Sequence, residues 1–185
     1  LIAGSRTPIG SFGRSLKNLP VNKLASHTML QTIRRAGLLP EQIDSIILGH
    51  GYQSSYTPNT ARVSAQDAQL PDSIPAMTVQ RQCGSGMEAA VIGTHEILLG
   101  KSDIVLAGGV ESMSTIPYLL PGKLRWQGLI AQQLPKLVRM GPRPVFFQIA
   151  DNGMAPTALI WDMKTIYMSG TAQRLADTYS ISRQD

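Results

Sequence analysis

Short apolar runs alternate with longer segments of helical periodicity in the first two thirds of the chain, and this alternation constrains the fold more than any other feature. Three runs have the length and composition of buried strands in a parallel sheet, namely residues 45–49, 76–79 and 103–107. Three segments carry apolar or small side chains at helical spacing, namely residues 21–36, 57–68 and 86–99. Strands separated by helices of this length predict an α/β layered fold with a largely parallel sheet.

Residues that start or stop helices support these boundaries. Gly37 and Gly100 follow two of the helical segments, at positions where a glycine commonly ends a helix. Thr57 followed by Pro58 has the pattern of an N-cap and a first helical residue. Residues 1–5 (LIAGS) are predicted to form the second half of a further strand.

The pattern changes near residue 120. The stretch 121–156 holds five prolines and shows little periodicity, with a possible helix at residues 127–139. A clearer helix is predicted at residues 170–179. We therefore expect an α/β core over residues 1–120 and part of a second domain over residues 121–185.

Composition and charge exclude several classes of protein. Hydrophobic residues make up 43% and charged residues 16% of the chain, which is ordinary for a globular domain. No run of about 18 apolar residues occurs, so no membrane-spanning helix is expected. A single cysteine excludes an intramolecular disulfide and a multi-cysteine metal site. The net charge of +5 suits an anionic partner, but the basic residues have no interleaved aromatic side chains, so a nucleic acid is not expected.

The only cysteine, Cys83, lies in the stretch VQRQCGSGMEAA, between a predicted strand and a predicted helix. Ligand sites of open α/β sheets gather at the carboxyl ends of strands, and a helix N-terminus favours a thiolate. Gly84 and Gly86 leave room for a substrate carbonyl, and the Cys83 amide can stabilise an oxyanion. These features make Cys83 a candidate nucleophile. The alternative is a small buried core residue, a common role for a lone cysteine.

A second function fits the same residues. GSGMEA at residues 84–89 matches the G-x-G-x-x-A pattern that binds dinucleotides, and it opens a helix after a strand, as that pattern requires. The acidic residue that would hold the ribose is Asp103. Asp103, however, begins the next predicted strand, whereas a ribose-binding acid belongs at that strand's far end, so dinucleotide binding is disfavoured.

Four segments resemble the thiolases, which are acyl-CoA C-acyltransferases, and they occur in the family's order. VQRQCGSGMEA at residues 79–89 resembles the nucleophile segment, and RTPIGSFG at residues 6–13 resembles the opening strand and loop. GGVESMS at residues 108–114 resembles the fourth-strand segment, and TAQRLA at residues 171–176 resembles a helix of the CoA-binding loop domain. The resemblance is nearly continuous up to residue 120.

This resemblance implies a fold and a reaction. The fold is the N-terminal half of an αβαβα architecture with an inserted loop domain, in a protein that forms homodimers or homotetramers. Cys83 would take an acyl group from an acyl-CoA or a 3-ketoacyl-CoA as a thioester, and pass it to CoA or to the enolate of acetyl-CoA. CoA would be a substrate or product, and neither a tightly bound cofactor nor a metal is expected.

The family's proton-handling groups are missing from this sequence. Thiolases use a His in a Gly-His-Pro motif and a second Cys, both in the C-terminal half, and neither occurs here. His27 and His95 fall within predicted helices, on faces expected to be solvated, and only His50 follows a strand at a position that approaches a site. We expect the chain to be part of a longer polypeptide and inactive without its C-terminal half.

CoA contacts implied by the resemblance are few. Met168 stands where the family places a Met beside the pantetheine arm, Tyr167 stands where many thiolases have a His, and Leu159 would line the same tunnel. Ordinary packing in the loop domain is the alternative for these three residues. Gln80 stands where an Asn is usual, which alters either the turn before Cys83 or the specificity.

The predicted function is that of an acetyl-CoA C-acetyltransferase or 3-ketoacyl-CoA thiolase, and an acyl-CoA is the expected substrate. The alternative is a thiolase-like condensing or acyltransferase enzyme that uses a carrier-bound acyl group, or a non-catalytic partner subunit. We expect no membrane partner and a cytoplasmic location, with mitochondria and peroxisomes as alternatives.

Overall fold

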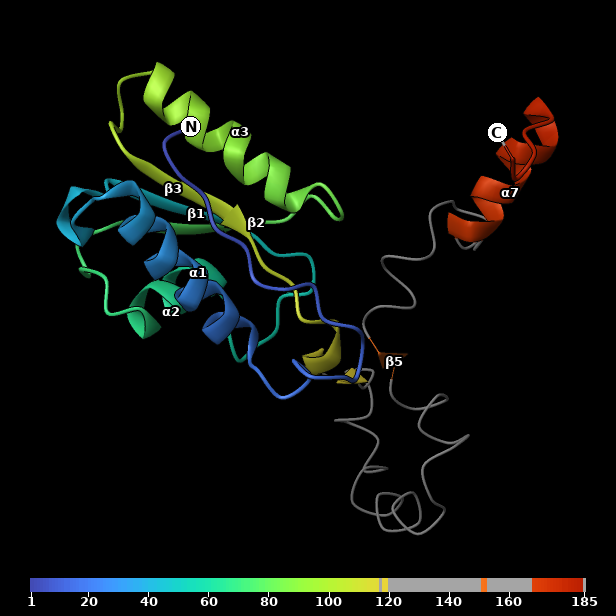
Figure 1. Cartoon of the computed structure of the whole chain (residues 1–185), viewed down its shortest axis with the longest axis horizontal. Coiled ribbons are helices and arrows are strands. Elements are labelled where there is room, and N and C mark those ends of the chain that lie inside the picture. Colours follow the sequence, from blue (N-terminus) through green and yellow to red (C-terminus); the bar gives the residue numbers. More distant parts are fainter. Residues whose placement is uncertain (117, 120–150, 153–167, 185) are drawn as a thin grey trace, which may run out of the picture. The chain divides into compact units, whose positions relative to one another are not determined.

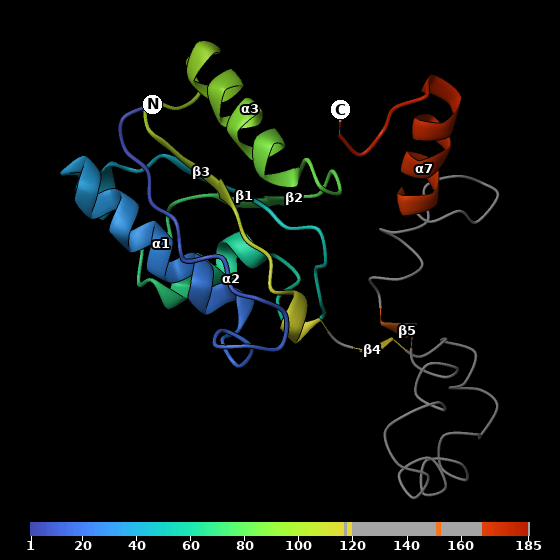
Figure 2. The same ribbon diagram turned by 45° about the vertical axis from the view of Figure 1, so that its right-hand side comes forward.

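A computed structural model describes residues 1–116, 118–119, 151–152 and 168–184, and the chain divides into two compact units, Leu1–Thr115 and Ile116–Asp185. The first unit is a three-layered α/β structure, in which α1 and α2 cover one face of a sheet and α3 covers the other (Figures 1 and 2). Its elements in chain order are α1 (Val21–Ala36), η1 (Pro40–Gln42), β1 (Ser45–Gly49), α2 (Thr60–Asp67), β2 (Ala76–Val79), α3 (Ser85–Leu98), β3 (Val105–Gly109) and η2 (Met113–Thr115).

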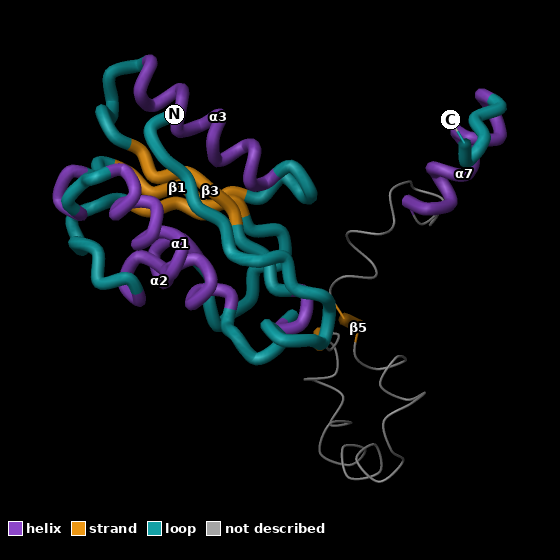
Figure 3. The backbone as a smooth tube through the Cα atoms, viewed as in Figure 1, coloured by secondary structure: helices purple, strands orange, loops and turns teal. Residues whose placement is uncertain are grey.

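The sheet has the strand order β2-β1-β3, and both strand pairs are parallel. Ile46 of β1 lies opposite Ala76 on one side and Leu106 on the other, so β1 is the central strand. Parallel neighbours place their carboxyl ends at one edge of the sheet, and the loops that follow the strands gather at that edge (Figure 3). This edge holds the Cys83 turn.

The core of the first unit forms between the sheet and its helices. Every residue of β1 is buried, and Ile46 and Ile47 have 0% exposed surface, because helices cover both faces of the central strand. Burial of each such side chain stabilises the fold by about 1.5–3 kcal/mol. Helix α1 contributes Ala25, Met29 and Ile33, which are four residues apart and therefore share one face.

Sequence periodicity predicted most of these elements. The bounds of α1, β1 and β2 agree with the prediction, and α3 begins and ends one residue earlier than expected. Strand β3 begins at Val105 instead of residue 103, because the amides of Asp103 and Ile104 donate to the side chain of Asp44.

The predicted cap of α2 is wrong. Asn59 caps this helix, with its side-chain oxygen accepting from the Arg62 amide at 3.1 Å. The side chain of Asn59 also contacts β2, because the Thr78 hydroxyl donates to it at 2.8 Å. Thr57 is buried instead, and its hydroxyl has no hydrogen-bond partner within the described part of the chain.

The predicted strand at residues 1–5 is also wrong. These residues belong to no strand and bond to α1: the Ser5 hydroxyl lies 2.6 Å from the hydroxyl of Thr32 and donates to the Thr28 carbonyl, and the Arg35 guanidinium donates to the Gly4 carbonyl. The Gly4 carbonyl, which a strand ladder would have used, thus accepts from a side chain of α1.

The second unit is described in part. Strands β4 (Tyr118–Leu119) and β5 (Asp151–Asn152) pair antiparallel, and α7 spans Met168–Tyr179, which confirms the helix predicted at residues 170–179. The helix predicted at residues 127–139 lies outside the described residues. Among the described residues, no helix has both the length and the apolar composition needed to cross a membrane.

Candidate active site at Cys83

Cys83 lies in the turn that joins the end of β2 to the start of α3. The Gly84 amide donates to the Arg81 carbonyl at 3.0 Å, and the Ser85 amide donates to the Gln82 carbonyl at 3.1 Å, so two short bonds close the turn. The buried hydroxyl of Ser85 donates to the same Gln82 carbonyl at 2.6 Å and accepts from the Arg81 amide at 2.9 Å. The backbone on both sides of Cys83 is therefore held in place.

The residue before the cysteine has a left-handed backbone. Gln82 has a φ of 49°, a backbone conformation that residues other than glycine adopt at a cost of about 1–2 kcal/mol. Cys83 itself is exposed and forms no disulfide. The interpretation of Cys83 as a small core residue is therefore wrong, and the structure presents its side chain to solvent at the N-terminal end of α3.

Two glycines, Gly49 and Gly109, let α3 approach the sheet next to this turn. A Cβ atom on Gly49, the last residue of β1, would lie 2.2 Å from the carbonyl carbon of Ser85. A Cβ atom on Gly109, the last residue of β3, would lie 3.0 Å from the Cα of Gly86. Backbone atoms at the start of α3 therefore contact backbone atoms at the ends of β1 and β3. This contact fixes how far the Cys83 turn lies from the edge of the sheet.

His50, the histidine that follows a strand, is buried, with a side chain that is 3% exposed. Its Nδ1 lies 2.7 Å from the Thr60 hydroxyl, and its Nε2 lies 3.1 Å from a carboxylate oxygen of Glu111. The second Glu111 oxygen accepts from the Gly51 amide at 3.0 Å, and the Gly51 carbonyl accepts from the Gln80 side chain at 3.1 Å.

These bonds connect the loops that follow all three strands. His50 and Gly51 follow β1, Gln80 follows β2, and Glu111 follows β3. The sequence had singled out His50 and Gln80, but Glu111 was not predicted. A detectable signal existed, because Glu111 is the first charged residue after an apolar strand, at the edge where parallel sheets place their sites.

Tyr52 shares the electrostatic environment of this edge. Partial burial raises the pKa of its phenol above the usual range, and the negative charges of Glu111 and then of Cys83 raise it further. The sequence offered no pattern that marks this residue.

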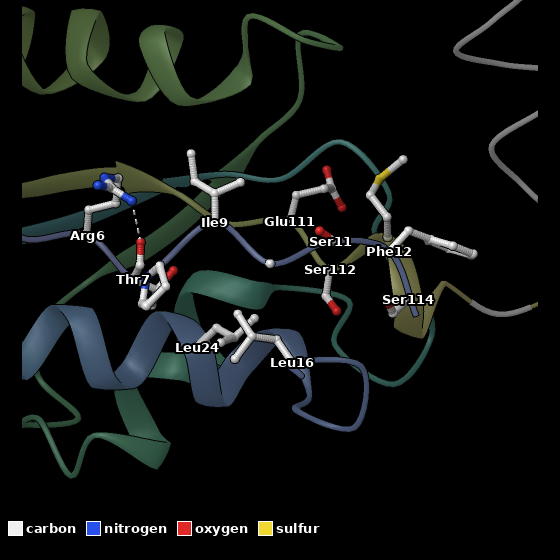
Figure 4. Close-up of a pocket in the computed structure, with 13 residues that line it drawn as sticks. Arg6, Thr7, Ile9, Ser11, Phe12, Leu16, Leu24, Glu111, Ser112 and Ser114 are labelled. Atoms are coloured by element: carbon white, nitrogen blue, oxygen red, sulfur yellow. Dashed lines mark hydrogen bonds between the residues drawn. The ribbon is translucent and has the colours of Figure 1, made fainter. Parts of the chain in front are cut away.

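A cavity of about 310 Å³ lies along the N-terminal segment, and Glu111 is part of its lining. Residues 6–12 and residues 111–114 form much of its lining, and Leu16 and Leu24 form its apolar floor. Figure 4 shows Glu111 above the N-terminal segment and the two leucines below it. Glu111 thus lines this cavity and also bonds to His50 and Gly51 in the loop that follows β1.

The other predicted residues fall elsewhere. His27 and His95 are exposed on α1 and α3, as expected. Met168 is the first residue of α7, and Leu159 and Tyr167 lie outside the described residues. Within the described ranges, no three His, Cys, Asp or Glu side chains are grouped in a way that could hold a metal ion.

The position of Asp103 argues against dinucleotide binding. Asp103 precedes β3, and its amide bonds to Asp44 at the amino edge of the sheet. The GSGMEA segment begins at the carboxyl edge, where α3 starts. An acid that holds a ribose would have to reach the same edge as the glycines.

Comparisons with known proteins agree on one family. The model of the thiolase N-terminal domain matches residues 1–185. An acetyl-CoA acetyltransferase of Cupriavidus necator is 33% identical over 188 residues, and a probable acetyl-CoA acyltransferase of Staphylococcus aureus is 34% identical over 185 residues. Each alignment covers 100% of this chain but 43% of the relative, so the chain spans less than half the length of these proteins.

Solved structures share the fold. The acetyl-CoA acetyltransferase of Bacillus anthracis has a TM-score of 0.82 at 36% identity, with 98% of this chain and 42% of that chain covered. A thiolase of Ascaris suum, solved in complex with coenzyme A, has a TM-score of 0.81 at 25% identity, with coverage of 99% and 43%. Because sequence and fold agree along its length, this chain belongs to the thiolase family and corresponds to that family's N-terminal domain.

Proposed function

We propose that this chain is the nucleophile-bearing part of an acyl-CoA C-acyltransferase, with Cys83 as the residue that accepts the acyl group. The observation that carries the proposal is the placement of an exposed Cys83 in a braced turn at the start of α3, in a family whose named relatives are acetyl-CoA acetyltransferases. The position of Cys83 in the sequence, the geometry of its turn and the family membership of the chain all support Cys83 as the nucleophile.

The reaction has two covalent steps. The Cys83 thiolate attacks the thioester carbonyl of an acyl-CoA, the bond between the carbonyl carbon and the CoA sulfur breaks, and CoA leaves as a thiolate that takes up a proton. The enolate of acetyl-CoA then attacks the acyl-enzyme and releases Cys83 with a 3-ketoacyl-CoA as product. The degradative direction runs these steps in reverse, and CoA then takes the acyl group.

The described residues contribute positioning and electrostatics. The start of α3 carries the partial positive charge of a helix N-terminus, which stabilises the thiolate and the oxyanion of the tetrahedral intermediate. Gly84 has no side chain that would block the carbonyl on its approach. Ser85 holds the turn still, so that the sulfur meets the substrate in one orientation.

The remaining parts of the site are assigned by the family resemblance. Residues 121–185 would form part of the loop domain that binds CoA, with Met168, Leu159 and Tyr167 as candidate contacts, and residues 1–120 would form the core. A longer polypeptide would supply the proton-handling groups in its C-terminal half, and the whole protein would assemble as a homodimer or homotetramer. Its cytoplasmic location stays a prediction.

The test is acylation of Cys83 in the full-length polypeptide. Incubation with acetyl-CoA should add one acetyl group to the intact mass, and peptide mapping should place that group on the peptide that contains Cys83. Cys83→Ser should remove the label and should also abolish exchange of free labelled CoA into acetyl-CoA, which requires only the first covalent step.

The outcomes separate the alternatives. Labelling that survives Cys83→Ser would contradict the assignment of the nucleophile. Labelling by a carrier-bound acyl group but not by acetyl-CoA would favour a condensing relative, and no labelling by either donor would favour a non-catalytic subunit.

A further inference from the structure

We propose that Glu111 is a positioning residue for Cys83, acting through the loop that follows β1. The inference rests on the proposed function, because it concerns the presentation of the nucleophile. It assigns a role to a carboxylate that does not itself touch the sulfur.

Glu111 bonds to two consecutive residues of that loop. One carboxylate oxygen accepts from the Gly51 amide at 3.0 Å, and the other lies 3.1 Å from His50 Nε2. The space around Gly51 is tight, because a Cβ atom on it would lie 2.9 Å from the nearer oxygen of Glu111. A carboxylate suits this place because it offers an acceptor to each of two converging donors.

The loop is bonded in turn to the segment that leads into the Cys83 turn. The His50 amide donates to the Val79 carbonyl at 3.0 Å, and the Gln80 side chain donates to the Gly51 carbonyl at 3.1 Å. Gln80 stands three residues before Cys83, and the turn bonds of Ser85 begin one residue later, at Arg81. Glu111, Gly51 and Gln80 therefore form a continuous path of hydrogen bonds from β3 to the nucleophile turn.

Removal and conservative replacement of Glu111 should have different effects. Glu111→Ala leaves the Gly51 amide and the buried ring nitrogen of His50 without their acceptor, so the loop is free to shift. Glu111→Gln keeps one oxygen for the Gly51 amide. Its NH₂ group can donate to His50 Nε2 when the ring carries its proton on Nδ1, which then donates to the Thr60 hydroxyl.

Asp44 is a matched control at the opposite edge of the same sheet. Its carboxylate accepts from the Asp103 amide at 2.8 Å and from the Ile104 amide at 2.9 Å. It thereby connects the start of β1 to the start of β3, as Glu111 connects their ends. Asp44→Ala therefore removes an equivalent connection between strands at the edge remote from Cys83.

The experiment compares Glu111→Ala, Glu111→Gln and Asp44→Ala in the full-length polypeptide, at a temperature where each variant is folded by circular dichroism. The readout is the exchange of labelled CoA into acetyl-CoA, with kcat and KM determined separately. We expect Glu111→Ala to lower kcat about tenfold to a hundredfold, with KM for acetyl-CoA within about twofold, because a misplaced nucleophile affects the chemical step. Glu111→Gln should restore kcat to within about threefold of the wild type, and Asp44→Ala should leave it within about twofold.

A second variant keeps the proposal testable if Glu111→Ala fails to fold. Gln80→Ala removes only an exposed side chain and with it the bond to the Gly51 carbonyl, so it should lower kcat in the same direction. Where Glu111→Ala does fold, its combination with Gln80→Ala shows whether the two residues act along one path, in which case their effects on kcat do not add.

Each outcome decides the question. Equal kcat values for Glu111→Ala and Asp44→Ala would overturn the proposal, and so would a Glu111→Gln variant as impaired as Glu111→Ala. If the wild type shows no exchange, the proposed function fails, and hydrogen–deuterium exchange of the peptide 79–90 still tests the positioning. Faster amide exchange there in Glu111→Ala but not in Asp44→Ala supports the role of Glu111, and equal rates contradict it.

Discussion

Ser85 has two bonds within the turn that presents Cys83. Its buried hydroxyl donates to the Gln82 carbonyl and accepts from the Arg81 amide, so one small side chain satisfies a donor and an acceptor of the backbone. Ser64 offers the opposite case in α2. It is also fully buried, but its hydroxyl has no hydrogen-bond partner within the described ranges.

The two serines should respond differently to the same substitution. Ser85→Ala should lower the free energy of unfolding by about 1–3 kcal/mol, because the Arg81 amide loses its acceptor. Ser64→Ala should be neutral or stabilising by a few tenths of a kcal/mol, because Ala has the higher helix propensity and no bond is lost. Urea unfolding of both variants measures the difference, and equal losses would contradict the role of Ser85 in the turn.

At the scale of elements, the contact between α3 and the sheet is made by backbone atoms. A side chain on Gly49 would collide with the Ser85 carbonyl carbon at 2.2 Å, whereas a Cβ atom on Gly86 would lie at an ordinary 3.7 Å from the Cα of Gly109. The two glycines face the same interface but differ in the space that each has.

Substitution of these glycines should therefore give different results. Gly49→Ala should lower the free energy of unfolding by about 1–3 kcal/mol or more, because α3 must move away from β1. It should also slow acylation of Cys83, which moves with the helix. Gly86→Ala should keep the fold, because its Cβ atom fits and Ala favours the helix. Similar urea midpoints for the two variants would show that α3 is not packed against β1 in this way.

A further prediction at this scale concerns acid. The backbone amides of Ile104 and Asp103 hold the pKa of Asp44 below its usual range. A carboxyl group whose pKa is lowered by folding contributes stability above its unfolded pKa, and that contribution disappears as the pH falls through the folded value. The wild type should therefore exceed Asp44→Ala in urea midpoint at neutral pH, and the difference should shrink below about pH 4.

Asp44→Asn serves as the control for titration, because its amide oxygen accepts hydrogen bonds but carries no proton that titrates in this range. A difference between wild type and Asp44→Ala that is equal at neutral and acid pH would contradict the assignment. The bonds to the Ile104 and Asp103 amides would then contribute nothing that depends on the charge of Asp44.

At the scale of the whole molecule, α3 carries large apolar side chains that this chain leaves exposed. Met87 is 73% exposed and Leu98 is 76% exposed, although both lie on the helix that starts at the candidate site. The chain covers 43% of the length of its curated relatives. We expect the rest of a full-length polypeptide to cover this helix face.

This expectation is tested by placing a charge on the helix in two contexts. Leu98→Glu should reduce self-association of the isolated 185-residue chain, because it removes exposed apolar surface. In the full-length polypeptide, it should lower the free energy of unfolding by about 2 kcal/mol or more, because the charge would be buried. His95→Glu places the same charge on the same helix and should change neither property by much. A full-length Leu98→Glu variant as stable as the wild type would show that the face stays open.

Elements encoded by local patterns could be predicted, and features that depend on distant residues could not. The bounds of β1 follow from five consecutive residues, SIILG, which are buried because of their composition. The cap of α2 is Asn59 instead of Thr57, since Asn59 also bonds to β2, and no local pattern predicts that contact. The position of Glu111 after an apolar strand was a signal that marks a candidate, but its bonds could not be predicted because Gly51 stands 60 residues earlier in the chain. Cys83 could be proposed as a nucleophile from the sequence because the features that mark it, a strand end, two glycines and a helix start, are local.

The glycine contact under α3 is made of main-chain atoms, so it tolerates changes in the side chains around it. Substitutions elsewhere leave such an interface unchanged, whereas a side chain at Gly49 would not fit. Variation in the surrounding loops should therefore leave the position of Cys83 relative to the sheet unchanged. Under the proposed function, attempts to alter acyl-chain selectivity should be directed at those loops, and Gly49 and Gly109 should be left in place.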